Sequence, residues 1–344
     1  MNHILPTSPA RRLNGAGCLL LGCLILMMLA GCSDRAENAQ DSAAAAAKTH
    51  TEPTTGMQFL FIKGDSFDMG DTFNDGFAGE VPVHKVTVSD YYIGVTEVTQ
   101  AQWEKVMGYN PSMFIGPDHP VDRVSWAEIR EFVRRLNEIN PGAGYRLPTE
   151  AEWEFAARER GKKIRWAGTN KEEEVGDYAW YLHNADQTSH PVATKKPNAL
   201  GLYDMSGNLW EWVYDKYGVF TPEEQIDPIG PDTGKYQDFG EDFRTYKGAA
   251  WDYIPRLLRV TQRSGNHPFY KRQWIGFRLA KDADPVNKPF KTPKYELNID
   301  NPEFKPSAGA EVDKLEVSPQ PPAAAPTPSP SAAGASTERK PKHD

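Results

Sequence analysis

The sequence predicts an α+β domain with little regular secondary structure. Three segments carry helix-start signals, several short stretches alternate apolar and polar residues as strands do, and the chain beyond Arg158 is rich in Gly, Pro and Asn. All nine tryptophans fall within residues 57–283, so the aromatic side chains can form one large core there. We therefore expect one folded domain over residues 57–283.

The first part of this domain is predicted to form strands. Residues 57–69 alternate apolar and polar side chains, and Gly64 and Gly70 interrupt or follow the pattern. This indicates a strand and a turn. Residues 83–93 predict a second strand, with Val86 and Val88 on one face and polar neighbours on the other. Shorter strand-like pieces follow at residues 207–214, 245–251 and 276–279.

Three helices are predicted by the same signal, a capping box, in which Ser or Thr at the helix start is followed three residues later by Glu or Gln. After the second box, apolar residues recur every three or four positions, as on the buried face of a helix. Gly108 is the expected end of the first helix. The three boxes are Thr99 with Gln102, Ser125 with Glu128, and Thr149 with Glu152.

The motif RLPTEAEWE at residues 146–154 is predicted to be architectural. It places Arg146, Glu150 and Glu154 beside aromatic residues that we expect to be buried. Carboxylates in such surroundings are stable only when they are paired or hydrogen-bonded. We therefore interpret the motif as a helix cap combined with an internal salt bridge.

The N-terminus is typical of a bacterial lipoprotein. Arg11 and Arg12 precede an apolar run over residues 16–30, which fits a signal peptide and is short for a membrane-spanning helix. Small residues then lead into Cys32, as in a lipobox. We expect residues 1–31 to be a signal peptide and Cys32 to carry lipid. The alternative is an N-terminal anchor that is never cleaved.

Lipid on Cys32 would place the protein in the cell envelope. Two or three acyl chains anchor a protein stably where one chain does not. Ser33 follows the cysteine, and in enteric-type lipoproteins it is Asp at this position that favours retention in the inner membrane. We therefore expect the periplasmic side of the outer membrane, in preference to the inner membrane.

Two segments outside the domain are predicted to be flexible. Residues 32–56 are rich in Ala, Asp, Thr and Ser, and we expect a tether there. Residues 284–344 become rich in Pro and Ala, so they are expected to form a disordered tail. The formal net charge is −8 and the sequence shows no basic stripe, which argues against nucleic acid as a partner.

Several segments together resemble one known family. They include RLPTEAEWE, the run GLYDMSGNLWEW at residues 201–212, and Gly276-Phe277-Arg278. This pattern is similar to the formylglycine-generating enzyme family, also called sulfatase-modifying factor domains, over residues 57–283. The resemblance implies the fold of that family, a C-type-lectin-like variant with low regular secondary structure.

The family's best-known chemistry is missing from this chain. Formylglycine-generating enzymes oxidise a substrate cysteine with two cysteines that bind copper(I), a soft ion suited to thiolates. The corresponding stretch here runs from Lys247 to Arg259 and contains no cysteine. Tyr253 stands near the first cysteine position, and Leu257 or Leu258 near the second. We therefore expect neither copper nor formylglycine generation, and we assign no catalytic residue.

A calcium site is implied by the resemblance. By position in the family motif, Asp204 and Glu211 would offer carboxylates, while Gly207 and Leu209 would offer carbonyl oxygens. Hard oxygen ligands of this kind suit Ca²⁺. The alternative is a turn capped by Asp204, with Glu211 paired to an arginine.

Two kinds of function remain open from the sequence. The first is a non-catalytic binding or regulatory module, for example an accessory of a secretion or signalling system with a protein or peptide partner in the periplasm. The second is a periplasmic oxidase or tailoring enzyme with a non-cysteine site, like relatives in pyoverdine maturation. The family's substrate groove would contain the residues Trp251, Asp252, Tyr253, Arg263 and Trp274, and such a groove can hold a peptide without doing chemistry.

Overall fold

The computed structural model describes residues 49–231, 243–286 and 290. All of them belong to the first of two compact units, Met1–Ile299. The predicted signal peptide, Cys32 and nearly all of the predicted tail lie outside the described residues.

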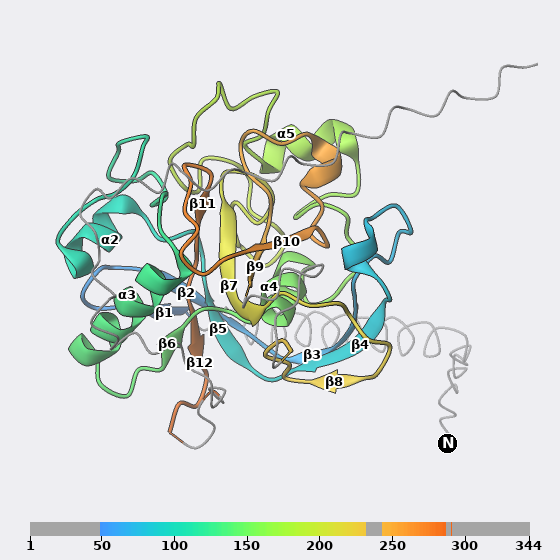
Figure 1. Cartoon of the computed structure of the whole chain (residues 1–344), viewed down its shortest axis with the longest axis horizontal. Coiled ribbons are helices and arrows are strands. Elements are labelled where there is room, and N and C mark those ends of the chain that lie inside the picture. Colours follow the sequence, from blue (N-terminus) through green and yellow to red (C-terminus); the bar gives the residue numbers. More distant parts are fainter. Residues whose placement is uncertain (1–48, 232–242, 287–289, 291–344) are drawn as a thin grey trace, which may run out of the picture. The chain divides into compact units, whose positions relative to one another are not determined.

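A five-stranded antiparallel sheet joins the two ends of the domain (Figure 1). Strand β12 (Ala280–Asp282), the last strand of the described residues, lies between β5 (Tyr91–Gly94) and β6 (Tyr145–Arg146), so the C-terminal end of the domain is held inside the sheet. The strands in spatial order are β1 (Thr49–Thr51), β2 (Gln58–Ile62), β5 (Tyr91–Gly94), β12 (Ala280–Asp282) and β6 (Tyr145–Arg146).

Strand β1 corrects the predicted tether. Residues 49–56 belong to the folded domain, because β1 pairs with β2 and the side chain of Glu52 is fully buried. The ring of His50 lies 2.7 Å from the Tyr145 hydroxyl, and Glu52 accepts a hydrogen bond from the Asn140 amide at 2.9 Å. These contacts are polar and come from distant residues, so no apolar period in the local sequence predicts them.

Two smaller sheets complete the strands. One has the order β10 (Arg263–Asn266), β9 (Arg244–Lys247), β7 (Trp210–Lys216) and β11 (Ile275–Gly276), with β11 parallel to β7. The other has the order β3 (Asp65–Met69), β4 (His84–Val88) and β8 (Gln225–Ile226). The alternation predicted for Val86 and Val88 is confirmed, since both are buried and their neighbours are less so.

The strand predicted over residues 57–69 is two strands in different sheets, β2 and β3, and the strand over residues 83–93 likewise divides into β4 and β5. Gly64 lies at the bend between β2 and β3, and it contacts the bend between β4 and β5. A Cβ atom on Gly64 would lie 2.2 Å from the Val88 carbonyl oxygen, and the Gly64 amide donates to Asp90 at 2.9 Å. A side chain at position 64 would therefore prevent the close approach of these two bends.

The three predicted helices are confirmed with their caps. Each N-cap side chain accepts a hydrogen bond from the third helical amide, and each box is closed by the Glu or Gln at that position. Gly108 ends the first helix with φ of 83°, in the left-handed region. The helices are α2 (Gln100–Met107), α3 (Trp126–Ile139), α4 (Glu150–Ala157) and the short α5 (Val175–Tyr178), with 3₁₀ turns η1 (Ala78–Glu80), η2 (Glu172–Glu174) and η3 (Pro255–Leu257).

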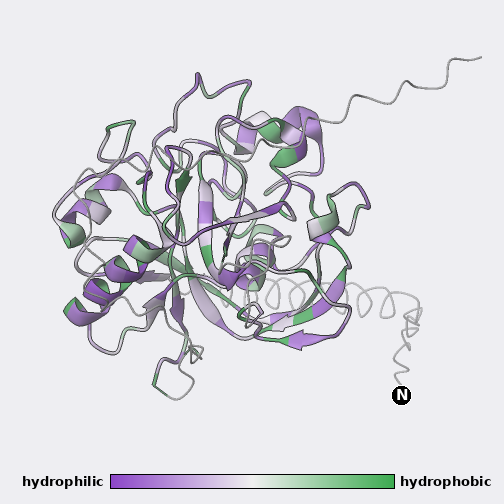
Figure 2. Ribbon diagram, in the orientation of Figure 1, coloured by the Kyte–Doolittle hydropathy of each residue, from purple (hydrophilic) through white to green (hydrophobic). Residues whose placement is uncertain are grey.

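The core is built from aromatic rings and buried ion pairs. Trp103 stacks on Phe132 with ring centroids 5.2 Å apart. In Figure 2, helices and strands each carry both hydrophobic and hydrophilic segments. The predicted internal salt bridge of the RLPTEAEWE motif is confirmed, and the motif makes several such ion pairs. The pairs are Arg146 with Glu152 and Asp282, Glu150 with Arg263, and Glu154 with Arg158 and Lys247.

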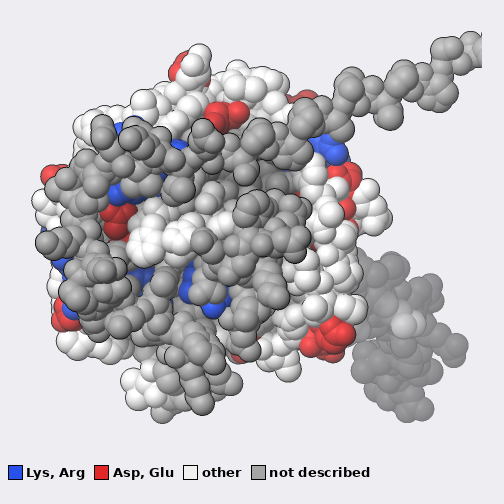
Figure 3. All heavy atoms as spheres, viewed as in Figure 1, with Lys and Arg blue, Asp and Glu red and all other residues white. Residues whose placement is uncertain are grey.

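The charged surface of the described residues is mixed. On the face seen in Figure 3, acidic and basic side chains are interspersed. Within the part of the chain that the structure describes, none of the helices has the length and apolar character needed to cross a membrane.

Candidate functional site

The loop that follows β9 is held tightly in place. Gly248 has φ of 94°, and a Cβ there would lie 3.1 Å from the ring of Trp153. The Gly207 amide donates to the Gly248 carbonyl at 2.9 Å, and the Trp251 amide donates to the Asn208 carbonyl at 2.9 Å. The loop is therefore fastened to the turn that precedes β7, and it presents its middle residues in a fixed orientation.

The positions that the resemblance assigns to cysteines hold packing side chains. Tyr253 is partly exposed, and its ring meets that of Trp210 edge-on at 5.5 Å. Leu258 is fully buried, and its carbonyl accepts a hydrogen bond from the Ser206 hydroxyl at 2.8 Å. Leu257 lies in η3 and is partly exposed. Neither tyrosine nor leucine can supply the thiolate that copper(I) or a mixed disulfide requires.

Three partly exposed aromatic side chains from this loop and its neighbours, supported by two buried ones, form a surface that we call the aromatic surface. Tyr253, Tyr270 and Trp274 are partly exposed, while Trp210 and Tyr246 lie buried beneath them. The ring centroids are 5.0 Å apart for Trp210 and Tyr246, 6.3 Å for Tyr246 and Trp274, and 5.6 Å for Tyr270 and Trp274. Rings at such spacings support one another's orientation.

Two residues of the predicted groove, Tyr253 and Trp274, lie on the aromatic surface. Trp251 is nearby but mostly buried, and its ring packs edge-on against Phe114 at 5.7 Å. Tyr270 was not among the predicted groove residues. The signal for it was the aromatic pair four residues apart in the loop between β10 and β11.

Asp252 lies beside this surface. Its side chain is partly exposed, yet the oxygen Oδ1 is covered and has no hydrogen-bond partner among the described residues. Burial raises the pKa of Asp252, and the hydrogen bond from its own backbone amide opposes this effect. The charge of Asp252 in turn contributes to the raised pKa of Tyr270, after burial.

Arg263 is placed in the interior. Its guanidinium donates to both oxygens of Glu150 at 2.7 Å and to the Gly218 carbonyl at 2.6 Å. Its side chain is 2% exposed, so the structure does not bring this group to the aromatic surface. Arg263 instead joins β10 to the start of α4.

The predicted calcium residues lie around a buried group of charges. Asp204 has φ of 57° and accepts a hydrogen bond from the Ala193 amide at 2.9 Å. Burial raises its pKa to about 6. Glu211 receives two hydrogen bonds from Arg278, each 2.7 Å, and a third from the Trp153 indole at 2.7 Å. The arginine partner considered as the alternative for Glu211 is thus present.

The residues fit calcium in part. The oxygen Oδ1 of Asp204 is buried without a hydrogen-bond partner among the described residues. An oxygen in this state fits a cation ligand. The carboxylate of Glu211 is occupied by Arg278 and Trp153. The described part of the chain contains no cluster of three or more His, Cys, Asp or Glu arranged to hold a metal. Calcium at Asp204, Gly207, Leu209 and Glu211 stays a prediction.

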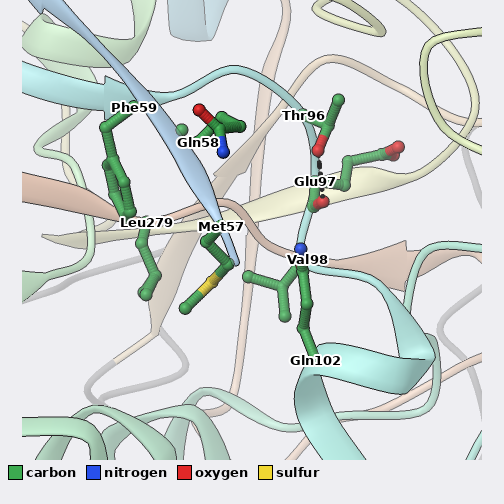
Figure 4. Close-up of a pocket in the computed structure, with 9 residues that line it drawn as sticks. Met57, Gln58, Phe59, Thr96, Glu97, Val98, Gln102 and Leu279 are labelled. Atoms are coloured by element: carbon green, nitrogen blue, oxygen red, sulfur yellow. Dashed lines mark hydrogen bonds between the residues drawn. The ribbon is translucent and has the colours of Figure 1, made fainter. Parts of the chain in front are cut away.

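Two cavities lie away from the aromatic surface. The first, beside Met57 and Glu97 (Figure 4), has a volume of about 10 Å³, which is room for one water at most. The second has a volume of about 340 Å³ and is lined by residues that include Asp68, Asp71 and Arg158. Arg158 is already bonded there to the Asp68 carbonyl and the Thr72 hydroxyl.

The sequence matches the Sulfatase-modifying factor enzyme 1-like domain over residues 44–283. The chain belongs to this family. It is 28% identical over 296 residues to the formylglycine-generating enzyme of Streptomyces coelicolor, covering 65% of this chain and 88% of that one. It is 34% identical over 218 residues to the chaperone protein LppX of Paenibacillus barcinonensis, covering 49% of this chain and 75% of that protein.

Solved structures confirm the predicted fold class. The variable protein 1 of Treponema denticola is similar with a TM-score of 0.62 and 30% identity, covering 69% of this chain and 99% of that chain. PvdO from Pseudomonas aeruginosa is similar in fold with a TM-score of 0.57 and 24% identity, covering 69% and 98%. The mixed sheets and few helices agree with the formylglycine-generating enzyme fold, and the curved sheet is compatible with a C-type-lectin-like variant.

Proposed function

We propose that this protein is a membrane-anchored member of the family that binds a partner in the periplasm and does not oxidise cysteine. The observation that carries the proposal is the absence of thiols. The chain has three cysteines, Cys18, Cys23 and Cys32, and all of them precede the matched domain. The matched domain therefore contains no cysteine side chain that could bind copper(I) or form a disulfide with a substrate.

A binding role is supported by what stands in place of the thiols. The loop after β9 keeps its fixed position, and it presents Tyr253 and Asp252 beside two more partly exposed aromatic rings. Aromatic side chains in a rigid setting are common anchors of protein interfaces. The relative LppX is named a chaperone protein, a name that describes work on other proteins. We therefore favour an accessory module, for example of a secretion or signalling system.

Anchoring is tested by Cys32→Ser. If the lipobox interpretation is right, this variant accumulates as an uncleaved, mislocalised precursor without lipid, because lipid attachment requires that sulfur. Incorporation of a labelled fatty acid and fractionation of the cell envelope measure the two effects. A variant that is processed and fractionated like the parent would contradict the anchoring proposal.

The binding role is tested against a tailoring oxidase by metal content. The protein purified from its native envelope is analysed for iron and copper by plasma mass spectrometry. The binding proposal predicts neither metal in stoichiometric amount. One equivalent of iron or copper would instead indicate an oxidase with a non-cysteine site.

A further inference from the structure

The larger of the two cavities has the size of a small-molecule site. Its volume is about 340 Å³, within the usual range for pockets that hold small ligands. Its lining comes from β3, from the loop between β3 and η1, and from the end of α4 and the residues after it. None of these lining residues belongs to the aromatic surface or to the loop after β9, so the cavity is a separate place in the fold.

Lys163 gives the cavity a cation without a carboxylate partner. It is exposed, it lines the cavity, and its ammonium lies 4.8 Å from the ring centroid of Phe73. Arg165, two residues further on, is paired with Asp75 at 2.8 Å. Among the described residues, Lys163 forms no such ion pair. Its charge is therefore left for an anion that enters the cavity.

Two further donors lie in the same wall of the cavity. Arg158 is 1% exposed, and its Nη2 donates to the Thr72 hydroxyl at 2.8 Å. Each terminal nitrogen of a guanidinium carries two hydrogens, and the described residues offer Nη2 no second acceptor. The Thr72 hydroxyl accepts this bond and keeps its own hydrogen to donate. The Arg158 Nε donates to the Lys162 carbonyl at 3.1 Å, so the peptide unit that leads into Lys163 lies against the guanidinium.

The cavity also contains carboxylates without a basic partner. Asp68 is exposed on β3 between two buried residues and lines the cavity. Among the described residues, it forms no ion pair with Lys163 or with any other cation. Asp71 is 4% exposed, and its oxygens accept hydrogen bonds from the amides of Phe73 and Gly76 at 3.1 and 2.7 Å. Carboxylate oxygens have further lone pairs, so both groups can accept hydrogen bonds from a cation.

Opposite charges that line one cavity without pairing with each other suit a ligand that carries both charges. A ligand with a carboxylate alone would bring its charge near Asp68 and Asp71, and a ligand with an ammonium alone would bring its charge near Lys163. A zwitterion offers each side the charge that it lacks. Val83 also lines the cavity and is 38% exposed, so an apolar part of the ligand can cover it.

We propose that this cavity binds the zwitterion of a free amino acid with an apolar side chain. The α-carboxylate accepts hydrogen bonds from Lys163 and Arg158, the α-ammonium donates to Asp68 and Asp71, and the side chain contacts Val83. This inference goes beyond the proposed partner binding, because it uses neither the aromatic surface nor the lipid anchor. It gives the protein a site for a small molecule.

The test uses the full-length protein in non-ionic detergent and three probes. Leucine carries both charges, N-acetylleucine keeps only the carboxylate, and leucinamide keeps only the ammonium. Binding is measured by calorimetry at about pH 6.5, where an α-ammonium group still holds its proton. We expect leucine to bind about tenfold more tightly than either analogue, because each analogue lacks one set of charge-assisted contacts. This preference should shrink as salt is raised.

Two variants and two matched controls assign the charges. Lys163→Gln should weaken leucine about tenfold and leave leucinamide unchanged, whereas Asp68→Asn should weaken leucine and leave N-acetylleucine no weaker. Lys162→Gln removes a neighbouring lysine that is paired with Glu159 and lies outside the lining. Asp65→Asn removes a carboxylate from the same strand, also outside the lining. Both controls should bind leucine like the parent, and melting curves check that every variant is folded.

Equal affinities for leucine and either analogue would overturn the inference, because the ligand would then need only one charge. A failure of leucine to bind would overturn it as well. So would a preference for leucine that survives both Lys163→Gln and Asp68→Asn, since these two side chains carry the charges that the inference depends on.

Discussion

Arg278 is expected to be among the most important single side chains for stability. It is fully buried, and it donates to both oxygens of Glu211, to the Gly94 carbonyl at 3.1 Å and to the Tyr203 carbonyl at 2.8 Å. Arg278→Met keeps much of the volume but leaves the Glu211 carboxylate with the Trp153 indole as its remaining donor of those described. The variant therefore buries an unpaired charge and bares two carbonyl groups.

The magnitude follows from this geometry. Removing one partner of a buried ion pair costs about 3–5 kcal/mol, and the lost carbonyl contacts place Arg278→Met toward the upper end. For a domain of this size, each kcal/mol lowers the melting temperature by about 2–4 °C, so we expect a decrease of about 10–20 °C. Urea unfolding followed by circular dichroism gives the free energy directly.

A paired variant sharpens the test. Glu211→Gln combined with Arg278→Met removes both charges, so the double variant should be more stable than Arg278→Met alone. A loss below about 1 kcal/mol for Arg278→Met would refute the reasoning. It would mean that Glu211 has another counter-ion in solution, and partial recovery of the variant by added calcium would identify that ion.

Two further outcomes concern carboxylates. Burial raises the pKa of Asp122 to about 7, above its unfolded value of about 3.9, so its contribution to stability is greatest below pH 4 and is lost as the pH rises toward 7. Asp122→Asn should therefore have a larger free energy of unfolding than the parent at pH 8, and this difference should vanish near pH 4. A difference in free energy, measured by urea unfolding, that stays the same across this pH range would contradict the prediction. Calcium bound only by the folded state, at about a hundred times its dissociation constant, adds about 2.7 kcal/mol to the free energy of unfolding. EGTA should then lower the melting temperature by several degrees, and Asp204→Ala should reduce this shift. Identical melting curves of the parent with calcium and with EGTA would remove calcium from the account.

The helices could be predicted because their signals are local. The pairs Thr99 with Gln102, Ser125 with Glu128, and Thr149 with Glu152 each close a hydrogen-bonded box within one turn. The strand breaks could not be predicted in this way. Residues 57–69 keep one alternating pattern across a bend that depends on contact between Gly64 and residues 88–90, which are distant in the sequence.

The site could be predicted in part for the same reason. Tyr253 and Trp274 are aromatic residues near a recognisable motif, and the structure places both on one surface. The position of Arg263 depends on Glu150, which is 113 residues away in the chain, and no local pattern indicates that pairing. Strand β1 likewise depends on β2 and on Asn140. Sequence reasoning thus fails where a residue's partner is distant.

The measurement that tests the central claim most directly is an assay of cysteine oxidation. The purified full-length protein is incubated with oxygen, copper(I) and a synthetic peptide that carries the modified cysteine of a sulfatase, and the peptide is analysed by mass spectrometry. The formylglycine-generating enzyme of Streptomyces coelicolor serves as the positive control. Because no thiol stands in the loop after β9, we predict no aldehyde product above the protein-free control. Turnover of the peptide by this protein would contradict the account.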